Sequence, residues 1–355
     1  MKSKLTHLVF GVLIALVGCK SIGPGQVAGD RFDYSAAIGE SWKRQTLLNI
    51  VKLRYLDPPI FVDVGQIVAS RSLSRSVNAG GTFGQGNNNN MTLGAAGIYT
   101  DQPTVTYTPL TGNKFIKSLM TPLPPESVFF MIQSGWPADG VLLSAVSSIN
   151  GLKNQTSSIK GTEPPTPEFL RALALMRQIQ LSGGVALRIQ QDAQKEETSI
   201  LALRRPDIAP ETLAESVELR RLLRLDPEAT EFKLVFGSTA ANDKELAVVT
   251  RSIIQLMGAM AAEVEVPAQD LAKHSAAPGW ESMSNATNAV RLIEIHSSKN
   301  NPEHAFVSVN YRDTWFWIDD RDLKSKRTFS FMMLLFTLAD TGEKVPLPQV
   351  TIPAR

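Results

Sequence analysis

The stretch IVASRSLSRSVNAGGTFGQGNNNNMTLGAAGIYT, residues 67–100, decides the fold of the first part of the chain, because its residues alternate with a period of two. From Ile67 to Phe83, and again from Met91 to Tyr99, one set of alternate positions is largely apolar and the other is mostly Ser, Thr, Asn and Gly. This alternation is typical of β-strands with one apolar face. Residues 84–90 (GQGNNNN) between the two runs tolerate positive φ. We therefore predict a long antiparallel hairpin that turns around residues 85–90, followed by a further strand near residues 104–108.

The hairpin has two interpretations that the sequence leaves open. In the first, it belongs to a sheet with one face on the protein core. In the second, several copies of the chain contribute hairpins to one shared membrane-spanning channel, because about ten alternating residues per strand suffice to cross a bilayer. Arg71 and Arg75 count against the second interpretation, since an arginine facing lipid costs about 2 to 4 kcal/mol near the bilayer midplane.

The first nineteen residues have the pattern of a secretory leader. Lys2 and Lys4 precede an apolar run, LVFGVLIAL at residues 8–16, which is typical of a signal peptide and too short for a spanning helix. The leader ends in Leu-Val-Gly-Cys at residues 16–19, which resembles the lipobox of bacterial lipoproteins. The resemblance implies a signal peptide at residues 1–18, cleavage before Cys19 and attachment of lipid to that cysteine.

An acylated Cys19 would tether the mature chain to a bilayer, because two or more acyl chains give a stable anchor. Lys20 follows the cysteine, whereas lipoproteins retained in the inner membrane of enteric bacteria have aspartate there. The resemblance therefore implies the outer membrane, on its periplasmic face. Three further runs, NIVKLRY at 49–55, GWPAD at 135–139 and DDRDLKSK at 319–326, resemble segments of bacterial envelope lipoproteins of unknown function and imply no activity.

The charge balance gives no reason to expect a nucleic-acid partner. The chain has 36 basic and 34 acidic residues. Two of the basic residues lie in the leader, so the mature part has 34 of each sign. Binding to nucleic acid requires a clustered cationic surface. We instead expect the bilayer, an envelope protein partner and possible copies of the same chain as binding partners.

The rest of the sequence predicts an α+β fold, with sheets backed by helices. A flexible tether at 19–37 leads to a helix at 41–55, which Pro58 and Pro59 stop. The predicted domains are a helix and hairpin domain at 38–151, a linker at 152–166, an α+β domain at 167–342 and an extended tail at 343–355. Further helices are predicted at 125–134, 138–149, 166–181, 210–224, 243–262 and 323–338. Further strands are predicted at 184–191, 198–203, 231–236, 290–297, 304–311 and 314–319.

Signatures of catalysis are missing from the sequence, so we predict a protein without enzymatic activity, metal or cofactor. The four histidines are His7, His274, His296 and His304, and no pair has the helical spacing of a zinc site. The chain has one cysteine, which the lipobox resemblance assigns to lipid, and it has no nucleophile elbow or phosphate loop. The sequence therefore predicts no catalytic, cofactor-binding or metal-binding residue.

One acidic cluster, Asp319–Asp322, follows an aromatic strand that contains Trp315 and Trp317. Carboxylates just before a predicted helix favour capping of its free N–H groups and pairing with neighbouring cations. The alternative interpretation is a ligand-binding or enzymatic module around Trp315 and Asp319–Asp322.

Taken together, the sequence favours a lipid-anchored, non-catalytic envelope protein that acts as a scaffold or accessory subunit through protein contacts. The first alternative is an oligomeric outer-membrane channel or export component that uses the 67–100 hairpin. The second alternative is the module around Trp315.

Overall fold

The computed structural model describes residues 24–68, 71–82, 90–158, 161–191, 197–203, 210–279 and 290–339. The predicted signal peptide, Cys19 and the predicted tail at 343–355 lie outside the described residues. The chain has the predicted α+β fold, with a long N-terminal helix, an antiparallel hairpin and then mixed helices and strands. It divides into two compact units, one with residues 1–41, 62–109 and 347–355 and the other with residues 42–61 and 110–346.

The N-terminal helix α2 spans Pro24–Arg54. Its predicted start at Ser41 is wrong, because the helix already covers most of the segment expected to be a flexible tether. Pro24 stands at the first helical position, where its missing N–H is not needed. Neither Gly29 nor Gly39 is required by close packing, since a Cβ at either position would meet nothing within 4 Å. The predicted end is confirmed, since the helix stops before Pro58 and Pro59.

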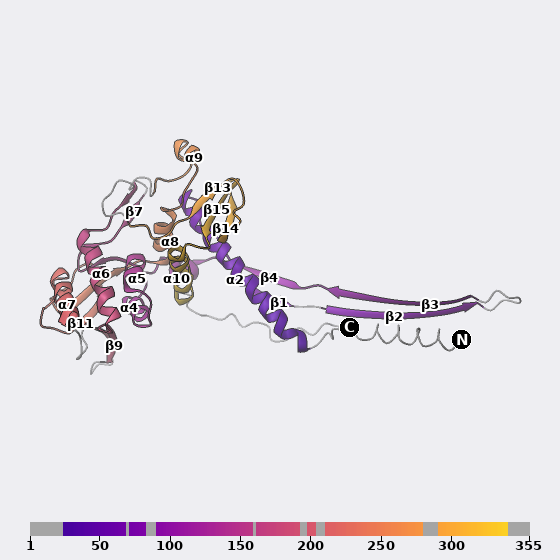
Figure 1. Ribbon diagram of the computed structural model, residues 1–355, viewed down its shortest axis with the longest axis horizontal. Helices are drawn as coiled ribbons and strands as arrows, with labels where there is room; N and C mark the ends of the chain where they lie inside the picture. The colour runs from indigo at the N-terminus through magenta and orange to yellow at the C-terminus, as the bar shows by residue number, and fades with distance from the viewer. Residues whose placement is uncertain are drawn as a thin grey trace. The chain divides into compact units, whose positions relative to one another are not determined.

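In the first unit, β2 (Arg71–Thr82) and β3 (Asn90–Asp101) run antiparallel and side by side along their whole length (Figure 1). Val77 lies opposite Ala95, and Ser76 lies opposite Ala96. The predicted hairpin is thus confirmed, but its first strand is shorter than the predicted one that began at Ile67. A separate strand, β1 (Phe61–Val68), pairs instead with β4 (Thr104–Leu110).

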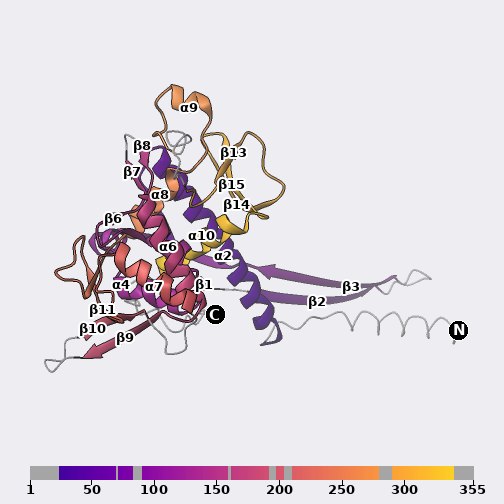
Figure 2. The same ribbon diagram turned by 60° about the vertical axis from the view of Figure 1, so that its left-hand side comes forward.

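The second unit is built on a six-stranded sheet in the order β6-β5-β12-β11-β10-β9. The strands are β5 (Val146–Ile149), β6 (Leu152–Lys153), β9 (Ala186–Gln191), β10 (Glu197–Ala202), β11 (Glu231–Phe236) and β12 (Glu245–Thr250). Neighbouring strands are antiparallel except β11 and β12, which are parallel. Helix α4 (Pro125–Gln133) packs on β9, β11 and β12, and α6 (Pro167–Leu181) packs against α5 (Ala138–Ala145) and α7 (Pro210–Leu222). Figure 2 shows α6 beside α7.

A second, three-stranded sheet in the same unit has the order β13-β15-β14, with β13 at His296–Ser298, β14 at Ala305–Tyr311 and β15 at Thr314–Asp319. Helix α10 (Leu323–Ala339) follows it and packs on α8 (Ile253–Ala261), which also contacts α3 (Asn113–Met120). A short helix, α9 (Ala268–Ala272), follows α8. A short pair of strands, β7 (Thr156–Ser158) and β8 (Gly161–Glu163), completes the unit.

Two predicted helices are wrong because strands replace part of each. The helix expected at 138–149 ends at Ala145, and the chain continues as β5, which pairs with β12. The helix expected at 243–262 begins at Ile253, because residues 245–250 form β12 in the middle of the large sheet. The strand expected at 290–297 is also too long, since only His296–Ser298 is extended in the sheet. The remaining predicted helices and strands are present, with ends that shift by a few residues.

The predicted linker at 152–166 contains β6, β7 and β8 and lies within the second unit. Strand β5 from before this segment, β6 within it and β9–β12 from after it belong to one sheet. Residues on both sides of the segment therefore contribute to the same core.

Asn49 holds the chain where it leaves α2. Its side chain is buried, with Nδ2 donating to the carbonyl of Ile60 at 2.7 Å and Oδ1 accepting from the N–H of Ile60 at 2.9 Å. The two bonds close the turn that contains Pro58 and Pro59.

We expect Asn49→Ala to lower the free energy of unfolding by about 2 to 3 kcal/mol, since it removes two hydrogen bonds and leaves the partners of a buried side chain unpaired. Denaturant titration of the full chain measures this change. Asn113→Ala, at an exposed residue in the first turn of α3, is the control and should change stability by less than about 0.5 kcal/mol. Equal effects of the two substitutions would contradict the role of Asn49.

Candidate functional site

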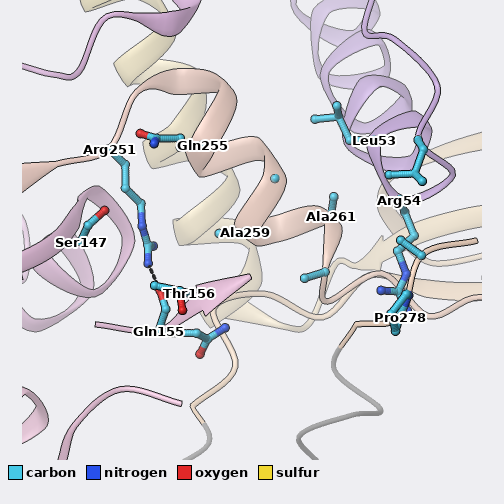
Figure 3. Close-up of a pocket in the computed structure, with 14 residues that line it drawn as sticks. Leu53, Arg54, Ser147, Gln155, Thr156, Arg251, Gln255, Ala259, Ala261 and Pro278 are labelled. Carbon is cyan, nitrogen blue, oxygen red and sulfur yellow. Dashed lines mark hydrogen bonds between the residues drawn. The ribbon is translucent and has the colours of Figure 1, made fainter. Parts of the chain in front are cut away.

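A cavity of about 370 Å³ lies in the second unit among the end of α2, helix α8 and the segment that enters β7 (Figure 3). Much of its wall consists of small or apolar side chains, including Leu53, Leu56, Ala259, Ala261, Ala262 and Pro278. Three buried polar side chains, Arg54, Gln155 and Arg251, complete it. Apolar walls with a few fixed polar groups are typical of small-ligand sites.

Arg251 follows β12 directly and is 4% exposed. Its guanidinium donates to the carbonyls of Leu143 at 3.2 Å and Ser144 at 2.9 Å, and to the carbonyl of Gln155 (Figure 3). Its own N–H donates to the carbonyl of Ala145 at 2.7 Å. One arginine therefore satisfies the last carbonyls of α5, where a helix favours a cation. Burial lowers the pKa of Arg251 to about 10, so it remains protonated at neutral pH.

Glu263, just beyond α8, is the buried acid of this region and is 1% exposed. Its carboxylate accepts from the N–H of Leu292 at 2.8 Å and of Ile293 at 3.2 Å, and from Nε2 of Gln155 at 3.3 Å. Burial raises the pKa of Glu263 to about 7, against the opposing effect of these hydrogen bonds. The carboxylate thus joins the 292–293 segment to a residue of the cavity wall.

Gln155 brings an available acceptor to the cavity. Its amide nitrogen is engaged by Glu263, whereas no donor within the described ranges reaches its buried Oε1. A buried carbonyl oxygen without a donor is unfavourable, so a ligand with an N–H or O–H group would gain a hydrogen bond there.

Arg54, the last residue of α2, is 2% exposed and closes the other end of the cavity beside Pro278 (Figure 3). Its carbonyl accepts from the N–H of Ala277 at 2.9 Å. A Cβ at Gly279 would collide with the Arg54 guanidinium and with the carbonyl of Ala262. The chain can therefore pass over Arg54 only because residue 279 is a glycine.

The residues singled out by the sequence lie elsewhere in this unit and bind one another. Asp322 accepts from the N–H groups of Lys324 and Ser325, both at 3.1 Å, which confirms the predicted capping of the following helix. Asp319 pairs with Arg321 at 2.9 Å, and Asp320 pairs with Lys326 at 2.7 Å. The hydrogen bonds from Arg321 hold the pKa of Asp319 far below its usual range.

The aromatic strand β15 presents two different faces. Phe316 and Ile318 are fully buried, whereas Trp315 and Trp317 are partly exposed. Trp317 packs against the ring of His296, with 4.9 Å between ring centroids. His296 in turn lies 3.3 Å from a carboxylate oxygen of Glu265. One face of this strand therefore lies in the core, and the other is partly exposed.

No family model matches this chain. No curated protein and no solved structure shows significant similarity to it either. The cavity and the hairpin therefore have to be interpreted from their own chemistry.

Sequence reasoning missed Arg251, Gln155 and Glu263. A partial signal was present, because Ser252 and Gln255 form a capping box in which Oε1 of Gln255 accepts from the N–H of Ser252 at 2.9 Å. That spacing marks the start of α8 and hence the end of β12, next to Arg251. Over the described ranges, no three His, Cys, Asp or Glu side chains come close enough to hold a metal ion.

The hairpin β2–β3 is the second candidate site. In the sheets formed by the described residues, these two strands pair only with each other. Val77 is 74% exposed, Ile98 64% and Tyr99 53%. A lone two-stranded hairpin is marginally stable in water, so the exposed apolar side chains make this hairpin a candidate interaction surface. None of the helices in the described part of the chain is long and apolar enough to cross a membrane.

The raised pKa of Glu263 predicts a pH-dependent stability. The folded chain binds the proton of Glu263 more tightly than the unfolded chain does. Protonated Glu263 therefore makes its full contribution to the free energy of unfolding below about pH 4.5, and this contribution is lost as the pH rises through about 7. Relative to Glu263→Gln, the natural chain should lose on the order of 3 kcal/mol of unfolding free energy between pH 4.5 and pH 8. Urea titrations at several pH values measure this difference.

The matched control is Glu168→Gln, at an exposed residue in the first turn of α6, which should leave the pH profile of unfolding unchanged. If Glu263→Gln and the natural chain show parallel pH profiles, Glu263 does not titrate in this window.

Proposed function

We propose that this protein is a lipid-anchored, non-catalytic subunit of an oligomeric channel or export component in the outer membrane, with β2–β3 as its assembly and membrane-inserting element. The observation that supports the proposal is a long amphipathic hairpin whose strands pair only with each other in the described chain. Copies of the same chain are the occupants we assign to its free edges.

The register of the hairpin separates two kinds of positions. Opposite pairs such as Val77 and Ala95 share one face, whereas Asn78 and Gly94, like Gly80 and Thr92, share the other. The first face is apolar beyond Arg75, although it also carries Arg71, Arg75 and Asp101 at the other end of the strands, and the second face is mostly small and polar. A strand with this division can turn one face to lipid and the other to a water-filled interior.

The length of the hairpin also suits a bilayer. Each strand has 12 residues, which corresponds to about 40 Å at about 3.3 Å per residue. About 9 to 11 residues of a tilted strand cross the hydrocarbon core. Arg75 is the fifth of the 12 residues in β2 and shares the face of Val77, so in the proposed arrangement the part of this face that meets lipid begins at Val77.

The free edges supply the attraction between copies. Both strands carry backbone N–H and C=O groups along the side that faces away from their partner, and such edges pair readily with other strands. Pairing of β2 from one copy with β3 of the next would satisfy these groups, which is required in lipid. In the remaining candidate function, a scaffold or accessory subunit, the edge would pair with a different protein.

The first experiment compares the native mass of the lipidated protein, extracted in mild detergent, with that of a form that lacks residues 77–97. We expect a discrete oligomer that dissociates when the segment is deleted. A monomeric lipidated protein would rule out the channel, and a complex with a different protein would favour the scaffold. Mass spectrometry of the mature N-terminus tests the predicted lipid on Cys19 independently.

A pair of neighbouring substitutions tests the orientation of the faces. Val77→Arg should weaken the oligomer, because an arginine in the lipid-facing part of the strand costs up to about 2 to 4 kcal/mol in every subunit. Ser76→Arg, on the opposite face, is the matched control and should still assemble while it changes ion conductance in planar bilayers. Equal assembly of both variants would contradict insertion of the hairpin into lipid.

A further inference from the structure

A second, larger cavity in the same unit is strongly basic. It has a volume of about 630 Å³ and is formed by α5, α6, α10 and the segment before β13. Four cations line it, Arg177, Arg291, Lys324 and Arg327, and the lining contains one carboxylate, Asp139. The cavity therefore carries an excess of three positive charges, whereas the mature chain as a whole is close to neutral.

Ion pairs compensate the charge of these cations in part, since Arg291 lies 3.8 Å from a carboxylate oxygen of Glu294. Asp139 is 3.9 Å from Arg177 and 55% exposed, so this pair is weak. Lys324 donates to the carbonyl of Arg291 at 2.6 Å, which holds its ammonium at the cavity without neutralising it. Arg327 is exposed, and no carboxylate in the described part of the chain forms an ion pair with it.

Arg177 is held in place by a glutamine. Its Nη1 donates to Oε1 of Gln180 at 2.6 Å, and Nε2 of Gln180 donates to the carbonyls of Ile132 and Trp136, both at 2.6 Å. Arg177 is thereby fixed beside Trp136, and fixed donors lose little entropy when they bind an anion. A smaller hollow of about 490 Å³, also lined by Trp136, Arg177 and Arg327, adjoins the cavity.

The inner wall of the cavity is apolar. It includes Val141, Leu173, Leu292 and Phe331, which are at most 3% exposed. Phe331 also packs against Trp136, with 5.3 Å between ring centroids. The cavity thus combines cations at its exposed side with a surface that favours hydrocarbon.

From this combination we infer that the basic cavity binds an amphiphile that carries a phosphate group, with the phosphate at Arg177 and Arg327 and its apolar part on the wall near Phe331. Guanidinium groups bind phosphate oxygens through paired hydrogen bonds. Several cations suit a phosphate, which has more oxygens and more charge than a carboxylate. A volume of 630 Å³ is within the usual size of ligand sites. The inference concerns the second unit and does not depend on the hairpin.

The test uses the lipidated protein in dodecyl maltoside micelles, which carry neither a net charge nor a phosphate group, and isothermal titration calorimetry. The four probes are hexyl phosphate, inorganic phosphate, hexanoate and hexyl glucoside, all soluble enough to be titrated as single molecules. Hexyl phosphate should bind at least about tenfold more tightly than inorganic phosphate, because burial of its chain is favourable. It should also bind more tightly than hexanoate and hexyl glucoside.

Arg177→Gln and Arg327→Gln should each weaken binding of hexyl phosphate about tenfold or more, since each removes a charged hydrogen-bond donor. Because Arg327 is exposed, Arg327→Gln still tests the inference if Arg177→Gln disturbs folding. Arg321→Gln, which removes an arginine 80% exposed and paired with Asp319, is the matched control and should bind normally.

Each other outcome would overturn the inference in a definite way. Equal binding of inorganic phosphate would reduce the cavity to a simple anion site. Equal binding of hexanoate would remove the preference for phosphate, and equal binding of hexyl glucoside would remove the role of the cations. Binding only to vesicles that contain anionic lipid, with no binding of hexyl phosphate, would indicate attraction to a charged membrane surface instead of a single bound molecule.

Discussion

The buried ionisable pair of Arg251 and Glu263 is the constraint on which the second unit depends. Charged groups leave water at a cost of several kcal/mol each, and in this protein backbone groups take the place of the water. The guanidinium of Arg251 donates hydrogen bonds to the end of α5 and to the segment before β7, whereas the carboxylate of Glu263 accepts hydrogen bonds from residues 292–293. Leu292 lines the basic cavity and Gln155 lines the other one. The shapes of both cavities therefore depend on these two side chains.

Much of the fold was predictable because local periodicity determines it. The two faces of β2 and β3 follow from the alternation of their residues, and α6 and β11 are bounded by prolines or polar turns that mark their ends. The predicted secondary structure is wrong where pairing between distant strands determines it. Residues 245–250 (ELAVVT) fit one turn of a helix as well as a strand, and only pairing with β11 and β5 selects the strand. Residues 146–149 are extended for the same reason, since β12 is their partner.

The candidate sites were less predictable than the fold. Gln155, Arg251 and Glu263 are ordinary surface residue types, and the sequence offers no pattern that brings them together, because Gln155 and Glu263 are separated by 108 positions. Arg177 and Arg327 likewise come from different helices, and only the packing of those helices turns two arginines into one basic site. Asp319–Asp322 was interpretable because its partners are close in sequence, so that local rules of helix capping apply.

The two edges of the hairpin are different, since one belongs to β2 and the other to β3. Edge pairing between copies would then be head to tail, a type of contact that has no built-in end. Such a chain of copies either closes into a ring, when the rotation from one copy to the next divides a full turn, or grows into a fibre. The number of subunits would accordingly be fixed by the angle between neighbouring hairpins and not by protein concentration. A lipid anchor that keeps every copy in one plane would favour closure, and the same sequence released from the membrane would be prone to form filaments.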